Sequence, residues 1–200
     1  MSFVDFLPHR LERKIERSFA VGGLPKTWWR AWADDIRHCR RCGGKLLWKI
    51  VRAEGRRRYV CDRCDRVSYQ NPKVIAATLP ERNGRIYLLR RAIEPARGLW
   101  TFPAGFMELA ETVDEAARRE TREEICCRVK LFGGPLIYSY DDAAVVTVVY
   151  RARVAGRAPR PGVESLEVRA FRPAEIPWEQ LAFRSTFHAL RDWAVKKTSE

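Results

Sequence analysis

Seven acidic side chains lie in the segment GFMELAETVDEAARRETREEICC, residues 105–127, although the whole chain carries 38 Lys and Arg against 25 Asp and Glu. On a helix, Glu120, Glu123 and Glu124 fall on one face, because residues three and four apart are neighbours. Like charges at this spacing repel each other. A divalent cation such as Mg²⁺ reverses that cost, because it prefers carboxylate oxygens and leaves positions for substrate phosphates. The spacing therefore indicates either a magnesium site or an ordinary acidic helix face in solvent.

Three nearby side chains could act together with these carboxylates. Arg119 lies one helical turn before Glu123 and can orient a carboxylate without covering the face on which a metal would bind. Glu111, at the junction between the preceding loop and the helix, is a fourth candidate ligand. Glu108, further back in the loop, is a candidate either for a ligand or for a group that supports one.

Four of the six cysteines form two close pairs, Cys39 with Cys42 and Cys61 with Cys64, separated by eighteen residues. This is the spacing of a four-thiolate zinc site, and four protein ligands close the coordination sphere, so the zinc should be structural. The alternative is two unrelated pairs of reduced cysteines. The other two cysteines, 126–127, are adjacent and poorly placed to bridge one another.

Charge and composition limit the possible partners and location. The net charge of +13 and a pI of about 9.9 favour anionic partners, such as phosphates or nucleic acid, or else describe a solvated basic surface. No apolar run is long enough to span a membrane, and the first twenty residues lack the apolar core of a secretory signal. We therefore expect a cytoplasmic protein with no membrane association.

The chain is expected to have three parts. Residues 1–35 form an N-terminal helical segment, with an amphipathic helix around residues 8–20 and three tryptophans between residues 28 and 32. Residues 36–70 form a zinc ribbon with short strands between the cysteine turns. Residues 71–200 form the main domain.

The main domain should contain both strands and helices. Apolar runs at 74–79 and 85–90 flank Asn83-Gly84 and predict a hairpin, and Thr112 with Glu115 has the spacing of a capping box that starts a helix ending near Ile125. Hairpins and helices together indicate a mixed sheet in an α/β fold. The other predicted elements are strands at 129–138, 143–154 and 166–171, a loop at 157–163 and a helix at 183–195.

The acidic segment resembles the Nudix box, which runs Gly-x5-Glu-x7-Arg-Glu-U-x-Glu-Glu-x-Gly-U with U apolar. Every charged position and the first glycine, Gly105, match that pattern. Three positions depart from it: Thr121 and Cys127 stand at apolar positions, and Cys126 replaces the final glycine. If that glycine needs a positive φ, Cys126 strains the end of the helix, but no metal ligand is lost.

The resemblance implies a Nudix-type α/β/α sandwich with a mixed β-sheet, preceded by the zinc ribbon. It also implies a catalytic Mg²⁺ or Mn²⁺, besides the structural Zn²⁺. Glu120 and Glu124 are the leading ligands, with Glu111 as a further one, and Glu123 acts as a ligand or a base. Arg119 belongs to the same catalytic group.

Glu164, in the loop GVESLE, is a candidate general base outside the box, or an ordinary loop glutamate. The partner implied by the resemblance is a small nucleoside diphosphate substrate. A nucleic acid partner is less favoured than this small molecule, and a homodimer is expected.

Residues 38–188 resemble a zinc-ribbon Nudix branch that hydrolyses ADP-ribose and FAD, through the zinc cysteines, YQNPK, GLWTFPAGFMELAET and PGVESLEVRAF with EIPWEQLAF. The implied activity is hydrolysis of the pyrophosphate bond of ADP-ribose or FAD, which releases AMP. An NADH pyrophosphatase or RNA NAD-decapping branch also has four zinc cysteines, but its Ser-Gln-Pro-Trp-Pro-like motif after the box is absent here. That branch and a non-catalytic nucleotide-sensing domain remain alternatives.

Overall fold

The computed structural model describes residues 13–14, 36–141 and 143–199, with side chains as far as residue 196. The helix predicted around residues 8–20 and the tryptophans between 28 and 32 lie outside the described residues, except that residues 13–14 are helical. The chain divides into two compact units, and among the described residues the smaller one comprises 36–72. No helix in the described part of the chain combines the length and apolar character needed to cross a membrane.

The smaller unit contains a three-stranded antiparallel sheet in the order β1-β2-β3. Strand β1 (Leu46–Val51) and strand β2 (Arg56–Cys61) are joined by a short 3-10 turn, η2 (Arg52–Glu54), and by Gly55 in the left-handed region. The short strand β3 (Val67–Ser68) adds to the other edge of β2. The short strands expected between the cysteine turns are therefore present.

The larger unit is built on an eight-stranded sheet with the central order β11-β5-β4-β10-β8, to which β6, β7 and β9 add at the sides. Strands β10 and β4 are parallel and the other pairs are antiparallel, so the sheet is mixed, as predicted. The strands are β4 (Lys73–Arg82), β5 (Arg85–Arg91), β6 (Trp100–Thr101), β7 (Ala104–Phe106), β8 (Arg128–Leu131), β9 (Leu136–Ser139), β10 (Val145–Ala155) and β11 (Ser165–Phe171).

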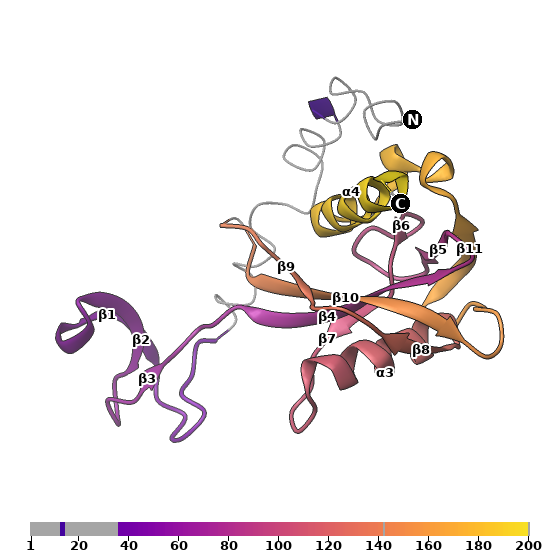
Figure 1. The fold of residues 1–200 in the computed structure, drawn as a ribbon. Coiled ribbons are helices and arrows are strands. Elements are labelled where there is room, and N and C mark those ends of the chain that lie inside the picture. The colour runs from indigo at the N-terminus through magenta and orange to yellow at the C-terminus, as the bar shows by residue number, and fades with distance from the viewer. Residues whose placement is uncertain (1–12, 15–35, 142, 200) are drawn as a thin grey trace. The chain divides into compact units, whose positions relative to one another are not determined.

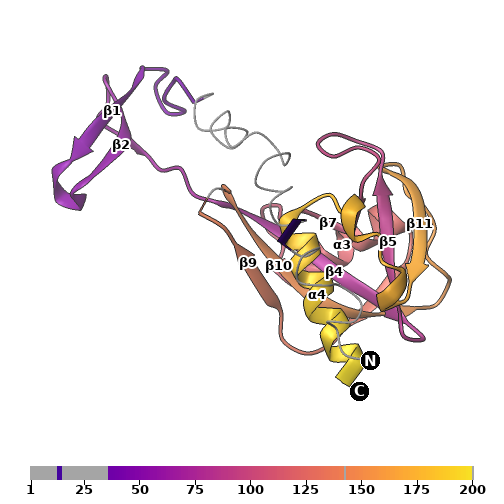
Figure 2. The ribbon, with the colours of Figure 1, turned by 90° about the horizontal axis from the view of Figure 1, so that it is seen from above.

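Two helices lie on opposite faces of this sheet, α3 (Val113–Ile125) below it and α4 (Arg184–Ser199) above it (Figures 1 and 2). Two short 3-10 turns, η3 (Pro173–Glu175) and η4 (Trp178–Gln180), connect β11 to α4. The predicted α/β/α sandwich is confirmed.

The alternation of side chains along β4 explains why both faces of the sheet are covered. Ala77 and Leu79 belong to the large core on the α4 side, whereas Ala76 contacts Ala116 and Ala117 of α3. Successive strand residues point to opposite faces, so a strand buried on both sides has an unbroken apolar run. The α4 side contributes the largest buried side chains, which include Phe102, Phe187, Leu190 and Trp193.

The hairpin predicted at Asn83-Gly84 is present, and both turn residues have positive φ, 53° and 69°. The single strand predicted at 129–138 is wrong. Gly133 takes a φ of 69° and Pro135 follows it, so the segment breaks into β8 and β9, which pair with different stretches of β10. A left-handed glycine and a proline without an N–H cannot continue a strand ladder.

Thr121, which stands where the Nudix box has an apolar residue, is fully buried. Its hydroxyl donates to the carbonyl of Ala117 at 2.7 Å and lies 2.7 Å from the hydroxyl of Thr78 on β4. A buried hydroxyl without a partner would destabilise the fold. The polar residue is therefore accommodated by a second threonine on the facing strand.

Both ends of α3 are fixed by local structure. Thr112 caps the first turn in a complete capping box with Glu115, as predicted. At the other end Cys126 adopts φ 49° and ψ 34°, the left-handed conformation that closes many helices and that glycine adopts most easily. Cys126 therefore replaces the final glycine of the Nudix box at a position whose φ is positive.

We expect Cys126→Gly to leave the melting temperature unchanged or to raise it. Glycine removes the left-handed strain, of about 1 kcal/mol, and the greater flexibility of the unfolded chain offsets part of the gain. The exposed thiol makes one weak contact, 3.7 Å from the carbonyl of Pro161. Thermal unfolding followed by circular dichroism measures the change. Cys126→Ala is the control, because it removes the thiol and keeps the strain. Equal loss of stability in both variants would show that the thiol packs productively.

Candidate active site

Strand β7 lies along the acidic face of α3, and three successive residues of the strand meet three residues of the helix. The N–H of Ala104 donates to the carboxylate of Glu124 at 2.8 Å. The carbonyl of Phe106 accepts a hydrogen bond from Arg119 at 3.0 Å. Between them, Gly105 faces Glu120. From Ala104 to Phe106 the strand rises about 6.6 Å, and from Glu124 to Arg119 the helix rises about 7.5 Å, so the two elements run side by side over this contact.

Gly105 is required by the closeness of Glu120. A Cβ atom on Gly105 would lie 2.2 Å from the carboxyl carbon and one oxygen of Glu120, well inside van der Waals contact. Any side chain here would push the carboxylate of Glu120 out of its position. The glycine that begins the motif therefore makes room for the carboxylate of Glu120.

Arg119 holds three carboxylates at once. Its guanidinium makes two contacts with Glu111, of 3.0 Å through Nε and 2.8 Å through Nη2. Its Nη1 donates to Glu120 at 2.6 Å and to Glu123 at 3.1 Å. Two parallel bonds to one carboxylate fix geometry as well as charge. Arg119 therefore contacts three carboxylates at once, not the single carboxylate that the sequence suggested, and its guanidinium lies among them.

The four carboxylates differ in their burial. Glu123 has 58% of its side chain exposed and Glu120 only 13%, whereas Glu124 is almost fully buried. The bond from Arg119 lowers the pKa of Glu111 to about 2. Burial raises the pKa of Glu120 above its ordinary range, against the effect of Arg119, and raises that of Glu124 to about 8. Burial therefore disfavours the charged forms of Glu120 and Glu124, and a nearby cation would favour them.

The loop before β11 closes the C-terminal end of α3. The carbonyl of Glu124 accepts hydrogen bonds from the N–H of Gly162 at 2.9 Å and from the hydroxyl of Ser165 at 2.7 Å. A Cβ on Gly162 would lie 1.9 Å from the carbonyl oxygen of Glu123, so this contact also requires glycine. The loop therefore fixes the helix turn that carries two of the acidic residues.

Glu164 belongs to the same loop and is exposed. Its backbone carbonyl accepts a hydrogen bond from the N–H of Ala92 at 2.9 Å. Its negative charge adds to the rise in the pKa of both Glu120 and Glu124. The structure therefore brings Glu164 near the acidic group. Glu108 contributes through its backbone, because its N–H donates to Glu111 at 2.7 Å.

Sequence reasoning missed Arg91, a buried arginine at the end of β5. Glu124 and Glu164 both attract its guanidinium, while burial lowers its pKa. Its Nε donates to the carbonyl of Pro95 at 2.8 Å. The alternation of side chains along β5 could have identified it. Arg91 lies two residues after the buried Leu89, so its side chain projects from the same face of the sheet.

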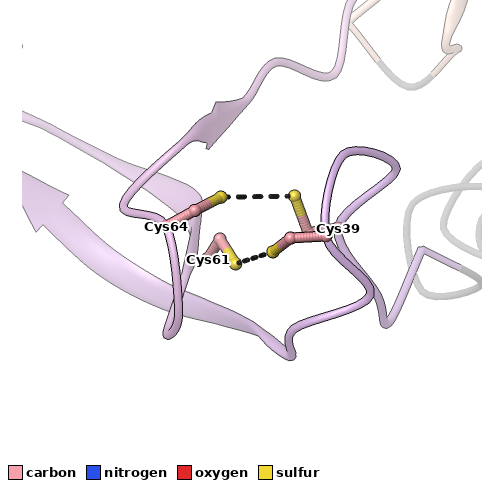
Figure 3. Close-up of side chains that lie close together, drawn as sticks. Cys39, Cys61 and Cys64 are labelled. Carbon is pink, nitrogen blue, oxygen red and sulfur yellow. Dashed lines mark hydrogen bonds between the residues drawn. The ribbon is translucent and has the colours of Figure 1, made fainter.

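Among the described residues, only the four paired cysteines bring three or more potential metal-ligand atoms together, all within 4.8 Å of one another. The Sγ atoms of Cys39 and Cys64 are 3.8 Å apart, and those of Cys42 and Cys61 are 3.4 Å apart (Figure 3). A tetrahedron with Zn–S bonds of about 2.3 Å has S···S edges of about 3.8 Å. The cysteine cluster therefore has the size of a tetrathiolate metal site.

The turns around the cysteines resemble one another. The N–H of Arg41 donates to Cys39 Sγ, and the N–H of Arg63 donates to Cys61 Sγ, both at 3.4 Å. The bond from Arg41 is the main reason why the pKa of Cys39 is lowered to about 6, and such bonds favour the thiolate that binds metal.

Gly44 completes this site. A Cβ at Gly44 would lie 2.8 Å from the Sγ of Cys61, so a side chain here would displace one of the four thiolates.

The carboxylates of α3 form no comparably tight group in the described structure, because the guanidinium of Arg119 lies among three of them. Their oxygens are nevertheless hard donors, and a bound cation would offset the cost of ionising the buried pair Glu120 and Glu124. Gly105 also leaves the space that the carboxylate of Glu120 occupies. The residues present therefore fit a divalent cation.

Two models of known protein families match this chain, one over the ribbon and one over the larger unit. The model of the NUDIX domain matches residues 70–191, and the model of the Nudix N-terminal zinc ribbon matches residues 37–70. Together they cover the described cysteine cluster, the sheet and the acidic helix.

Two curated relatives are similar over about half of this chain. An ADP-ribose pyrophosphatase from Methanocaldococcus jannaschii is 32% identical over 121 residues, 58% of this chain and 69% of that protein. A NAD-capped RNA hydrolase NudC from Pseudomonas fluorescens is 31% identical over 99 residues, 50% of this chain. The match spans only 34% of the length of that hydrolase.

Solved structures extend the likeness to about four fifths of the chain. A NUDIX hydrolase from Nitrosomonas europaea is 39% identical, with a TM-score of 0.77, and the match covers 82% of this chain and 93% of that one. A MutT NUDIX hydrolase from Burkholderia pseudomallei is 27% identical with a TM-score of 0.51, over 60% of this chain and 96% of that one. The chain therefore belongs to the Nudix family of hydrolases, which act on phosphorus-containing anhydrides, and carries the family's N-terminal zinc ribbon.

Proposed function

We propose that the protein hydrolyses the pyrophosphate bond of nucleoside diphosphate-linked metabolites, with ADP-ribose or FAD as substrate, in a reaction that requires Mg²⁺ or Mn²⁺. Water attacks one phosphorus, the bond from that phosphorus to the bridging oxygen breaks, and the proton of the water passes to a base. ADP-ribose would give AMP and ribose 5-phosphate, and FAD would give AMP and FMN.

The contact between β7 and α3 is the observation that carries this proposal. Glu124 is tied to the backbone of Ala104, and Glu120 occupies the space left by Gly105. Arg119 fixes the relative positions of the remaining carboxylates. A helix face that served only for solubility would need none of these constraints, whereas a metal site needs its ligands held in advance.

We assign Glu120 and Glu124 as the principal ligands, with Glu123 and Glu111 as further candidates. A divalent cation bound there would supply positive charge that neutralises the diphosphate and lowers the pKa of a coordinated water. Glu111 is held by Arg119 and by the N–H of Glu108, so its main contribution would be to hold Arg119 in place.

The base is proposed to be Glu164 or Glu123. Both are exposed carboxylates that can exchange protons with solvent, and Glu164 lies close enough to influence Glu120 and Glu124 electrostatically. A carboxylate base accepts the proton of the attacking water only when it is ionised. The charge of Arg91 lowers the pKa of Glu124 and so favours its ionised form, against the effect of burial.

The relatives support two substrate classes. The similarity to an ADP-ribose pyrophosphatase favours the small metabolites. The similarity to a NAD-capped RNA hydrolase keeps NADH and NAD-capped RNA as an alternative, although the motif typical of that branch is absent. Faster turnover of NAD-capped RNA or NADH than of ADP-ribose and FAD would favour the alternative.

The complete set of carboxylates argues against a domain that only senses nucleotides.

The cysteine cluster is proposed to hold one structural Zn²⁺ per chain through Cys39, Cys42, Cys61 and Cys64. Elemental analysis of the purified protein should return about one zinc per chain. Cys61→Ser should lose the metal and destabilise the ribbon, because the energy of metal binding is also folding energy. Cys126→Ser, which changes a cysteine outside the cluster, should keep full zinc content. Protein that folds normally without zinc would contradict the assignment.

Glu120→Gln and Glu124→Gln should each reduce kcat by about 100-fold or more. Both changes preserve shape and remove one negative charge, and the loss should fall on kcat more than on KM, because the charge on the diphosphate grows in the transition state. Steady-state hydrolysis of ADP-ribose and FAD at saturating Mg²⁺ measures the effect, and melting temperatures confirm that the variants fold.

Glu115→Gln is the matched control on the same helix. Its side chain belongs to the capping box, a role that glutamine can also fill, so activity should stay near that of the wild type. If Glu120→Gln and Glu124→Gln are as active as this control, the acidic face of α3 is not the active site.

A further inference from the structure

The zinc ribbon carries most of the net positive charge of the chain. Between residues 36 and 70 the sequence has eleven basic and three acidic side chains, which give +8 of the formal net charge of +13. Four thiolates around one Zn²⁺ would subtract two charges, so the ribbon remains basic. Of the described basic side chains of the ribbon, Arg58 alone forms an ion pair, with Glu54. The exposed ones are Arg37, Arg40, Arg41, Lys45, Lys49, Arg52, Arg56, Arg57, Arg63 and Arg66.

One face of the ribbon sheet presents aromatic, apolar and basic side chains together. Trp48 is the cross-strand partner of Tyr59, and Ile50 is the partner of Arg57. Directly opposed residues on paired strands project from the same face. Trp48 is 53% exposed and Ile50 is 61% exposed, and Arg57 is also exposed. We call these four side chains the ribbon patch.

We propose that the ribbon patch binds single-stranded nucleic acid, with a base stacked on Trp48 and the phosphates beside it paired with Arg57 and neighbouring basic residues. The indole of Trp48 packs against Tyr59, with ring centroids 4.8 Å apart at an angle of 57°, so one side of it is supported by a second ring. Surfaces that bind single strands combine positive charge along the backbone with aromatic rings on which bases stack. The ribbon patch has both parts within two adjacent strands.

Three other occupants fit the patch less well. A second copy of the chain would bring a second ribbon of the same high positive charge against the first, and like charges repel. A duplex hides the faces of its bases, so Trp48 would have nothing on which to stack. An acidic peptide could pair with the arginines, but it offers no flat ring to cover the exposed indole.

The fold of the ribbon reduces the cost of binding. The cysteine cluster, closed by a metal, joins the turn before β1 to the turn after β2 (Figure 3). The two strands between these turns are paired along their full length, six residues each. Side chains on such a braced sheet lose little freedom when a ligand arrives, which favours affinity.

This inference does not depend on the hydrolytic reaction proposed above. A test can therefore use a ligand that contains no anhydride. The probe is a 12-nucleotide RNA with a 5′-hydroxyl end and a fluorescein at its 3′ end, and binding to the full-length, zinc-loaded protein is followed by fluorescence anisotropy. Glu120→Gln protein should bind this RNA as well as the wild type, which separates the patch from the active site.

The variants separate stacking from charge. Trp48→Leu should weaken binding about tenfold and leave the salt dependence unchanged, because one stacked base is lost and no phosphate contact is lost. Trp48→Phe, which keeps a ring, should recover most of the affinity. Arg57→Ala should reduce the slope of log K against log salt by about 0.7, the value for one phosphate contact on a single strand. Lys130→Ala, on the exposed face of β8, removes the same charge elsewhere and should change neither quantity.

Zinc content and circular dichroism are measured for each variant first. Should Trp48→Leu lose zinc, the salt slope of Arg57→Ala and the affinity of Trp48→Phe still decide the question. Undetectable RNA binding by the wild type would overturn the proposal. Equal competition by the duplex of the same sequence or by polyglutamate of equal charge would also overturn it, as would equal effects of Arg57→Ala and Lys130→Ala.

Discussion

The geometry of the candidate active site depends on the contacts of the guanidinium of Arg119. This guanidinium joins Glu111, Glu120 and Glu123, which would otherwise repel one another on and beside a single helix. The carbonyl of Phe106 ties the same guanidinium to β7, and the N–H of Ala104 ties Glu124 to that strand. The capping box at Thr112 and the contact of Gly162 then fix the two ends of the helix that carries these groups. The rest of the sheet supports β7 and α3 in this arrangement.

Local patterns in the sequence predicted the features that depend on a single element. The period of a helix places Glu120 and Glu124 on one face, the capping box marks the start of α3, and the cysteine spacing marks the cysteine cluster. The sequence could not show that Gly162 closes the helix, because that contact depends on a loop far along the chain. The break between β8 and β9 was missed because two apolar runs were taken as one, although Gly133 and Pro135 stood between them.

The charges of this chain are divided between its two units. Acidic side chains gather on α3, where Glu120 and Glu124 face β7, and basic side chains gather on the ribbon, where most of them are exposed. A diphosphate is attracted to the first only in the presence of a cation, whereas a phosphate chain is attracted to the second directly. The homodimer expected from the sequence remains a prediction, as does the border between the ribbon and the Nudix domain.

The central claim is that the carboxylates of Glu120 and Glu124 bind the catalytic cation. Crystals of the protein grown with Mn²⁺ would locate that cation through its anomalous scattering. We predict an anomalous peak within coordination distance, about 2.2 Å, of carboxylate oxygens of both residues. A peak elsewhere in the larger unit, or no peak at α3 at saturating Mn²⁺, would contradict the account.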